Sequence, residues 1–190
     1  MKRNSKICII TGSRAEWGIF YPLACKLKES EFVLQIIATG SHLSKRHGLT
    51  YKEIEKDGFE IDYKTEIPLT DDTEEAMAKS TSDGIAQCTK GLQCLEPDLV
   101  FLLGDRFEIF AAAVAATALK IPIAHIHGGE LTEGSMDNTF RHAITKMSHL
   151  HFVACDVYRN RVIQMGEDPS TVFNVGALAV DNIMRLRGEK

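Results

Sequence analysis

The sequence has no excess of positive charge. Its 22 Lys and Arg are outnumbered by 26 Asp and Glu, which gives a net charge of -4 with histidine neutral. Proteins that bind the phosphates of nucleic acid or an anionic membrane surface concentrate Lys and Arg on one face. The charge balance therefore argues against nucleic-acid readers and polybasic membrane anchors, and we expect neither nucleic acid nor a membrane among the partners.

Long apolar runs and paired cysteines are lacking too. The run from Ile7 to Ile10 is too short for a signal-peptide core, and no stretch approaches the roughly 18 apolar residues of a membrane span. The five cysteines are widely spaced, with no C-x-x-C pair and no histidine at zinc-ligand spacing. These absences predict a cytoplasmic protein without a metal site.

What the chain does have is the composition of an ordinary globular domain, with 44% apolar residues in a length of 190. A domain takes roughly 150 residues, and a chain of this size buries enough surface to fold without disulfides. The sequence therefore predicts one domain with a short additional segment.

Short apolar, β-branched runs alternate with stretches of helical periodicity along the whole chain. This alternation predicts an α/β fold, a doubly wound, Rossmann-like parallel sheet with helices on both faces. The expected helices cover residues 17–27, 50–57, 73–95, 107–119, 137–148 and 156–165, and the expected strands cover residues 7–10, 32–39, 60–67, 99–103, 123–126, 150–153 and 172–175.

The last segment does not complete this pattern. Leu178 to Leu186 begin an amphipathic helix that has no further element to connect to. We expect residues 1–177 to form an N-terminal domain, and residues 178–190 to begin the connection to a C-terminal domain that the chain lacks.

Polar side chains gather where the predicted strands end, which is where open α/β sheets bind ligands. At any one position a solvated loop is the simpler explanation, but the coincidence at four strands favours a site. The residues are Ser13, Arg14 and Glu16 after the first strand, Ser41 and His42 after the second, Asp105 and Arg106 after the fourth, and His127 and Glu130 after the fifth, with His125 inside it.

The first of these loops is typical of an anion site. Gly12 permits a sharp turn before a helix N-terminus, and the planar guanidinium of Arg14 suits a diphosphate, although a surface ion pair is an equally simple role for it. The G-x-G-x-x-G fingerprint and the Walker loop are both absent, so neither a dinucleotide nor a P-loop nucleotide site is indicated.

Two aspartates are candidates for proton transfer. Asp105 follows an apolar strand and a glycine, so its carboxyl group stands at the edge of the core, where its pKa can be tuned. It could equally cap the helix that follows. Asp137 could act in catalysis, or it could cap its own helix and pair with Arg141 four residues later.

Several longer segments resemble one family, the hydrolysing UDP-N-acetylglucosamine 2-epimerases, and most of all its bacterial sialic-acid branch, the NeuC-type enzymes. The segments are TGSRAEWG, ATGSHL, LLGDRFE, HIHGGELTEG, RHAITKMSHLHF and VFNVGALAVDNI, so the likeness extends over essentially the whole chain.

This resemblance implies the N-terminal half of a glycosyltransferase-B-like fold, in which two Rossmann-like domains enclose the active site. It also implies conversion of UDP-N-acetylglucosamine and water to N-acetylmannosamine and UDP through a glycal, in sialic-acid-type biosynthesis, without metal or cofactor. The partners would be the UDP-sugar and further copies of the chain in a homo-oligomer. With its second domain missing, the chain alone would be inactive.

The resemblance also assigns roles. Asp105 and Asp137 match catalytic positions, and we assign substrate binding to Gly12, Ser13, Arg14, His42, Arg106 and Arg141. Mammalian relatives have glutamate directly after a His-Ile pair, where this chain has His127, and its glutamate follows at Glu130. Either residue could hold the acid/base role.

Three other interpretations remain open at this point. The donor could be UDP-diacetylbacillosamine, as in legionaminic acid synthesis, because both branches share these motifs. The chain could be half of a glycosyltransferase, or a nucleotide-sugar-binding module without catalysis.

Overall fold

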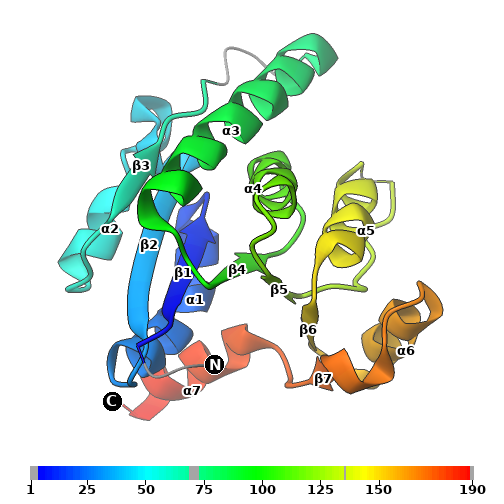
Figure 1. Cartoon of the computed structure of the whole chain (residues 1–190). Helices are drawn as coiled ribbons and strands as arrows, with labels where there is room; N and C mark the ends of the chain where they lie inside the picture. The colour runs from blue at the N-terminus through cyan, green and yellow to red at the C-terminus, as the bar shows by residue number, and fades with distance from the viewer. Residues whose placement is uncertain (1–3, 69–72, 135, 189–190) are drawn as a thin grey trace.

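The fold is seen in a computed structural model that describes residues 4–68, 73–134 and 136–188. Adjacent strands all pair in parallel, in the order β3-β2-β1-β4-β5-β6-β7. This sheet confirms the predicted fold class (Figure 1). The strands are β1 (Lys6–Thr11), β2 (Val33–Thr39), β3 (Tyr63–Thr65), β4 (Leu99–Leu103), β5 (Ile123–Ile126), β6 (Leu150–Val153) and β7 (Val172–Asn174).

Helices connect the strands and cover both faces of the sheet. They are α1 (Arg14–Lys28), α2 (Tyr51–Lys56), α3 (Glu74–Leu95), α4 (Phe107–Ala118), α5 (Asp137–Met147), α6 (Asp156–Gln164) and α7 (Leu178–Gly188), with 3-10 turns η1 (Gly40–Leu43), η2 (Lys45–His47) and η3 (Pro169–Thr171). No helix within the described ranges is long and apolar enough to cross a membrane.

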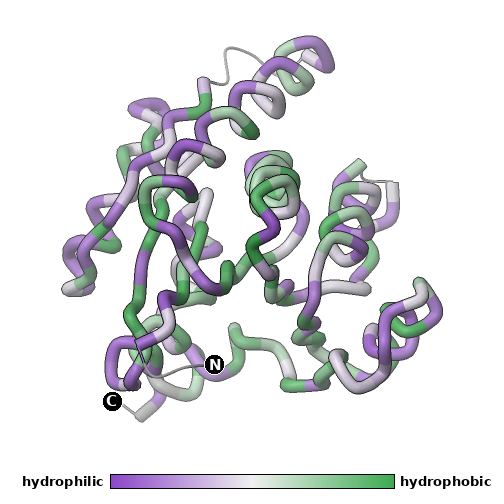
Figure 2. The backbone as a smooth tube through the Cα atoms, in the orientation of Figure 1, coloured by the Kyte–Doolittle hydropathy of each residue, from purple (hydrophilic) through white to green (hydrophobic). Residues whose placement is uncertain are grey.

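Alternation along each strand divides the core into two layers. In β4, Phe101 faces the layer with α1, whereas Val100 and Leu102 face the layer with α3 and α4. Figure 1 shows α3, α4 and α5 on one side of the sheet and α1 and α7 on the other. The helix α4 is apolar along most of its length (Figure 2), because its alanines are buried on nearly every side.

Most predicted elements are confirmed to within two residues, but two predictions need correction. The strand expected at residues 60–67 is only Tyr63–Thr65. Just before β3 the N–H of Asp62 still donates to the carbonyl oxygen of Ile36 at 2.9 Å, but the N–H of Ile36 is accepted by the Asp62 carboxylate at 2.7 Å, so a side chain takes the place of one backbone acceptor. The first helix begins at Arg14, so Arg14 and Glu16 belong to its first turn rather than to a loop.

The helix expected after residue 177 is present as α7, which packs back against α1. Asn182 donates from Nδ2 to the carbonyl oxygen of Gly18 at 3.1 Å, and Leu178 packs on the core beside α1. This segment is therefore part of the same folded body, while a domain boundary at residue 177 stays a prediction.

The strand order also fixes where a ligand can enter. The strands β1 and β4 are neighbours, yet the chain leaves β1 for α1 on one face and leaves β4 for α4 on the other. Loops diverge at such a switch point and leave a crevice beyond the carboxyl ends of the strands. The segments around Gly12 and Asp105 border this point.

Candidate active site

Four residues after β4 and β5 and on α5 form one group, here called the acid cluster: Asp105, His127, Glu130 and Arg141. The guanidinium of Arg141 is buried and donates from Nη2 to Asp105 and from Nη1 to Glu130, the latter at 3.2 Å. The Arg141 side chain is 7% exposed, whereas those of Asp105 and Glu130 are 18% and 25% exposed. The cluster therefore holds its cation inside and turns its carboxylates toward solvent.

Glu130 is kept ionised by its neighbours. Burial raises its pKa, but a hydrogen bond with His127 and the charges of His127 and Arg141 outweigh this and hold the pKa below its ordinary value. The distance from His127 Nδ1 to Glu130 Oε1 is 3.2 Å. An ionised, partly exposed carboxylate that is fixed in orientation can accept a proton from a ligand.

His127 combines two unusual features. Its φ of 64° lies in the left-handed region, which a non-glycine residue adopts at a cost. Its Nε2 is buried and has no hydrogen-bond partner within the described parts of the chain. Unsatisfied groups and strained backbone of this kind concentrate at functional sites.

His125 is a buried residue of β5 that lies between two of the segments that carry the acid cluster. It is fully buried, and its Nε2 donates to the carbonyl oxygen of Gly104 at 2.8 Å. Burial lowers its pKa to about 3, so the ring is neutral at physiological pH. Its Nδ1 is then an acceptor and lies 3.2 Å from Thr145 Oγ1, and the single proton of this hydroxyl can go to Nδ1 or to the carbonyl oxygen of Arg141, which is 3.0 Å away. The buried imidazole thus lies between the end of β4, to which it is bonded, and the helix that carries Arg141.

A second group, here called the arginine clasp, consists of Glu16, Arg106 and Glu108. Arg106 Nε donates to Glu108 Oε1 at 2.6 Å and lies 3.8 Å from Glu16 Oε1. The side chains of Glu108 and Glu16 are 0% and 7% exposed, whereas that of Arg106 is 47% exposed. The clasp holds its carboxylates inside and turns its cation toward solvent.

Glu16 also binds the loop after β1. Its Oε2 accepts the N–H of Gly12 at 2.7 Å, and its Oε1 accepts the hydroxyl of Ser13 at 3.2 Å. Burial is the main reason that its pKa rises to about 8, with the nearby charge of Glu108 adding to the rise. The N–H of Gly12 is therefore already hydrogen-bonded within the fold.

The other predicted site residues lie around these two groups. Arg14 is exposed and forms no hydrogen bond or ion pair with the residues that the structure describes, so its predicted alternative as a surface ion pair finds no support. Asp137 begins α5. Burial lowers the pKa of Arg106, but the contact with Glu108 and the smaller contributions of Glu16 and Asp137 outweigh it and raise the pKa.

His42 is not brought to the exposed edge with the others. It is fully buried, with Nε2 3.2 Å from Thr11 Oγ1 and Nδ1 2.9 Å from Thr50 Oγ1. Burial lowers its pKa to about 4, so the ring is neutral. Direct contact with a substrate would require this region to open, and the substrate-binding role of His42 stays a prediction.

The predicted capping roles of the two aspartates are wrong. Arg106, not Asp105, occupies the N-cap position of α4, and its side chain forms no capping hydrogen bond. The Asp105 carboxylate pairs with Arg141 instead. Met136 occupies the cap position of α5, and Asp137 is already helical. The ion pairs of Arg141 run to Asp105 and Glu130, which lie far from it in the sequence.

Sequence reasoning missed Glu108 as a functional candidate. It is the single charged residue in the mostly apolar segment from Phe107 to Leu119, and this isolation in a buried helix was the available signal. No group of three or more His, Cys, Asp or Glu within residues 4–68, 73–134 and 136–188 is arranged to hold a metal ion.

Comparison with known proteins identifies relatives of the whole chain. A diacetylbacillosamine 2-epimerase (hydrolysing, GDP/UDP) from Campylobacter jejuni is 45% identical over 92% of this chain and 45% of its own length. Polysialic acid biosynthesis protein P7 from Escherichia coli is 41% identical over 95% of this chain and 46% of its own. The chain therefore spans about half the length of the curated relatives it matches.

Solved structures agree on the fold. The Methanocaldococcus jannaschii UDP-GlcNAc 2-epimerase, in complex with UDP-GlcNAc and UDP, superposes with a TM-score of 0.84 at 24% identity, over 97% of this chain and 51% of the other. The family model described as UDP-N-acetylglucosamine 2-epimerase matches residues 25–190. This match includes the acid cluster, Arg106 and Glu108, and the chain belongs to the UDP-N-acetylglucosamine 2-epimerase family.

Proposed function

We propose that the chain is the N-terminal half of a hydrolysing UDP-sugar 2-epimerase, which releases UDP and a 2-epimerised N-acetylated sugar. The observation that carries this proposal is the pairing of opposite clusters at one strand edge. One turns two carboxylates outward, held by Arg141, and the other turns the guanidinium of Arg106 outward. Removing a carbon-bound proton while expelling an anionic diphosphate requires both kinds of group.

In this mechanism the acid cluster moves protons. Glu130, which is held ionised, accepts the proton of carbon 2 as base while the UDP diphosphate leaves as an anion, and Asp105 takes part in the second proton transfer, when water adds. Asp137 is a third carboxyl group at the same edge. Arg141 fixes the directions of Asp105 and Glu130, and His127 hydrogen-bonds to Glu130. Water then adds to the resulting glycal with inversion at carbon 2.

The leaving diphosphate is stabilised by cations and by a helix end. Arg106 is half-exposed beside the switch point, and Arg14 stands at the N-terminus of α1. A helix N-terminus and a guanidinium both favour negative charge, and a guanidinium binds phosphate oxygens in a bidentate manner. No metal or nicotinamide is required for this elimination and hydration.

Two donor sugars fit the proposal, and the relatives do not favour the simpler one. A UDP-N-acetylglucosamine donor, which would give N-acetylmannosamine for sialic acid, matches a relative from Neisseria meningitidis serogroup B that is 33% identical. A UDP-diacetylbacillosamine donor, used for legionaminic acid, matches relatives that are 45% and 42% identical. We therefore propose both donors as candidate substrates.

The test is an NMR assay of the two-domain protein with each donor in turn. We expect release of UDP and of a 2-epimerised free sugar from at least one donor. Transfer of the sugar to an acceptor would favour a glycosyltransferase, and saturable binding without turnover would favour a binding module. Either result would overturn the proposal.

The same assay tests whether this chain works alone. We propose that the 190-residue chain has no catalytic activity by itself, because one side of a cleft neither positions the substrate nor shields it from water. Positioning accounts for roughly 7 to 11 kcal/mol of barrier reduction in well-oriented reactions. Sustained turnover by the isolated chain, near that of the two-domain protein, would contradict this.

The location and assembly follow as further proposals. All five cysteines are free, as expected in a reducing cytoplasm. A homo-oligomer is expected from the family resemblance, and analytical ultracentrifugation of the two-domain protein would test it.

A further inference from the structure

Glu108 is a buried acidic residue, and two nearby glycines leave space for its side chain. Its side chain is fully buried beneath the segments that follow β1 and β2. A Cβ atom on Gly12 would lie 2.7 Å from Glu108 Cγ, and one on Gly40 would lie 2.8 Å from Glu108 Oε1. Two glycines at the ends of two strands therefore leave the space that this carboxylate fills.

Burying Glu108 is costly, and stability does not explain it. Its Oε2 is buried and accepts no hydrogen bond within the described residues, and Glu16, a second carboxylate, is nearly buried beside it. Replacing a buried ion pair by apolar side chains is often neutral or stabilising, so such a pair is weak evidence for a role in stability. A role in holding Arg106 explains it better.

The contact between Glu108 and Arg106 fixes one side of the guanidinium and leaves the other side open. Glu108 accepts from Nε, the inner nitrogen. The two Nη atoms form no hydrogen bond or ion pair with residues in the described ranges, and the side chain is 47% exposed. A guanidinium held by Nε presents its two terminal nitrogens as a preoriented fork for two anionic oxygens.

We propose that Glu108, assisted by Glu16, is a positioning residue that aims the Arg106 fork at the diphosphate of the UDP-sugar. This inference rests on the proposed function for its ligand, but the clasp itself is a property of this chain. Glu108 does not touch the substrate. It acts by removing the freedom of Arg106, so less ordering has to be supplied when the diphosphate binds.

The test compares ligands that differ only in the diphosphate. Glu108→Gln in the two-domain protein removes the negative charge but leaves an amide oxygen that can accept from Arg106 Nε. It is expected to weaken UDP binding by about threefold to tenfold, the charge-assisted part of one hydrogen bond, and to leave uridine binding unchanged. Arg106→Lys should produce a loss of similar size. Because both variants disturb one contact, the double variant should lose much less than the product of the two single losses.

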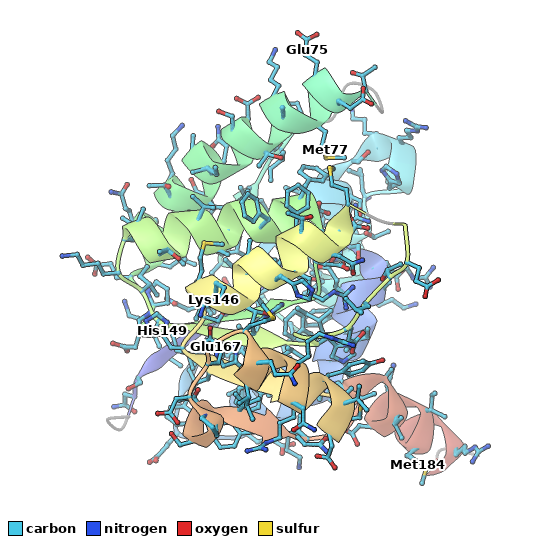
Figure 3. All side chains as sticks on the ribbon, turned by 90° about the vertical axis from the view of Figure 1, so that its right-hand side faces the viewer. Glu75, Met77, Lys146, His149, Glu167 and Met184 are labelled. Carbon is cyan, nitrogen blue, oxygen red and sulfur yellow. The ribbon has the colours of Figure 1, made fainter. Side chains whose placement is uncertain are left out.

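The control variant is Glu167→Gln, which removes a partly buried carboxylate from another ion pair. Glu167 Oε1 lies 2.5 Å from Lys146 Nζ at the opposite edge of the sheet, and Figure 3 labels the two residues side by side. We expect this variant to bind UDP like the wild type. An equal loss of uridine and UDP binding in Glu108→Gln would show a merely structural role and would overturn the proposal, as would unchanged UDP binding.

A measurement without ligand separates the clasp from the proposed function. In the 190-residue chain labelled with nitrogen-15, the Arg106 Nε–H should exchange slowly with water, and Glu108→Gln should accelerate this exchange. If the wild type binds neither UDP nor uridine, the proposed function fails while this result still tests the clasp. Fast exchange in the wild type would overturn the positioning role directly.

Discussion

The acid cluster and the arginine clasp are built from the same kinds of side chain, one arginine and two acidic residues, in opposite arrangements. Each places one arginine between two carboxylates at the carboxyl edge of the sheet. In the acid cluster the arginine is 7% exposed and its carboxylates are 18% and 25% exposed. In the clasp the arginine is 47% exposed and its carboxylates are 7% and 0% exposed. Burial alone decides whether such a triad offers a base or a cation to a ligand.

The elements that carry the charges explain this inversion. Arg141 extends from the second turn of α5 back toward the ends of β4 and β5, so its guanidinium is enclosed by protein. Glu16 and Glu108 instead lie in the first turns of α1 and α4, where the helix dipole favours negative charge. In each triad, the position of a residue on its helix therefore decides whether its side chain is buried.

The largest effect should come from an outward-facing carboxylate. Asp105→Asn in the two-domain protein should reduce kcat by roughly 100- to 10,000-fold, because the amide cannot transfer a proton but can still accept a hydrogen bond from Arg141. The measurement is turnover, with circular dichroism to verify folding. Asp98→Asn is the matched control, since Asp98 lies at the other end of β4 and accepts the N–H of Lys6 at 2.8 Å. Activity of Asp105→Asn within about threefold of the wild type, far below that range, would contradict the acid/base role.

A second comparison lies within the acid cluster. Glu130→Gln should reduce turnover by about tenfold more than His127→Asn, because Glu130 is held ionised and partly exposed, while His127 hydrogen-bonds to it. Asparagine tolerates the left-handed backbone at position 127, so that variant should fold. Kinetics of both folded variants check the ranking. The reverse order would assign the acid/base role to His127.

The sequence could predict where these groups lie but not which way they face. Alternating apolar runs specified the sheet, and strand ends specified the edge at which Asp105, Arg106 and Glu130 meet. The pairing of Arg141 with Asp105 spans 36 residues, and local rules offered a nearer partner in Asp137 instead. Burial of Glu108 depends on glycines in two other loops, which is information that no local pattern contains.

The third prediction concerns the inward-facing carboxylate of Glu16. Its pKa is about 8 in the fold, against an ordinary value of 4.5, so the folded state binds more protons between these values and stability falls as the pH rises through them. Glu16→Gln mimics the protonated form. Its free energy of unfolding relative to the wild type should therefore rise, by on the order of a few kcal/mol, between about pH 5 and pH 8.

Urea unfolding at three pH values measures this difference. The matched control is Glu75→Gln, which changes an exposed carboxylate in the first turn of α3 (Figure 3). Its stability relative to the wild type should change much less with pH. If the free energies of unfolding of Glu16→Gln and the wild type changed with pH by the same amount, Glu16 would not be held in its protonated form.

The smallest effect should come from the space around the clasp. Gly12→Ala places a Cβ 2.7 Å from Glu108 Cγ, so the buried glutamate must shift, and we expect a loss of about 1 to 3 kcal/mol in the free energy of unfolding. Gly18→Ala is the matched control, because no atom beyond its chain neighbours and the local helix backbone lies within 4 Å of a Cβ at this position in the interior of α1, and alanine should stabilise the helix there by about 0.5 to 1 kcal/mol. Chemical denaturation measures both.

If the clasp causes the loss, adding Gly12→Ala to Glu108→Ala should cost much less than adding it to the wild type, since the obstructing side chain is gone. An equal cost in both backgrounds would mean that Gly12 serves the backbone turn rather than the room for Glu108.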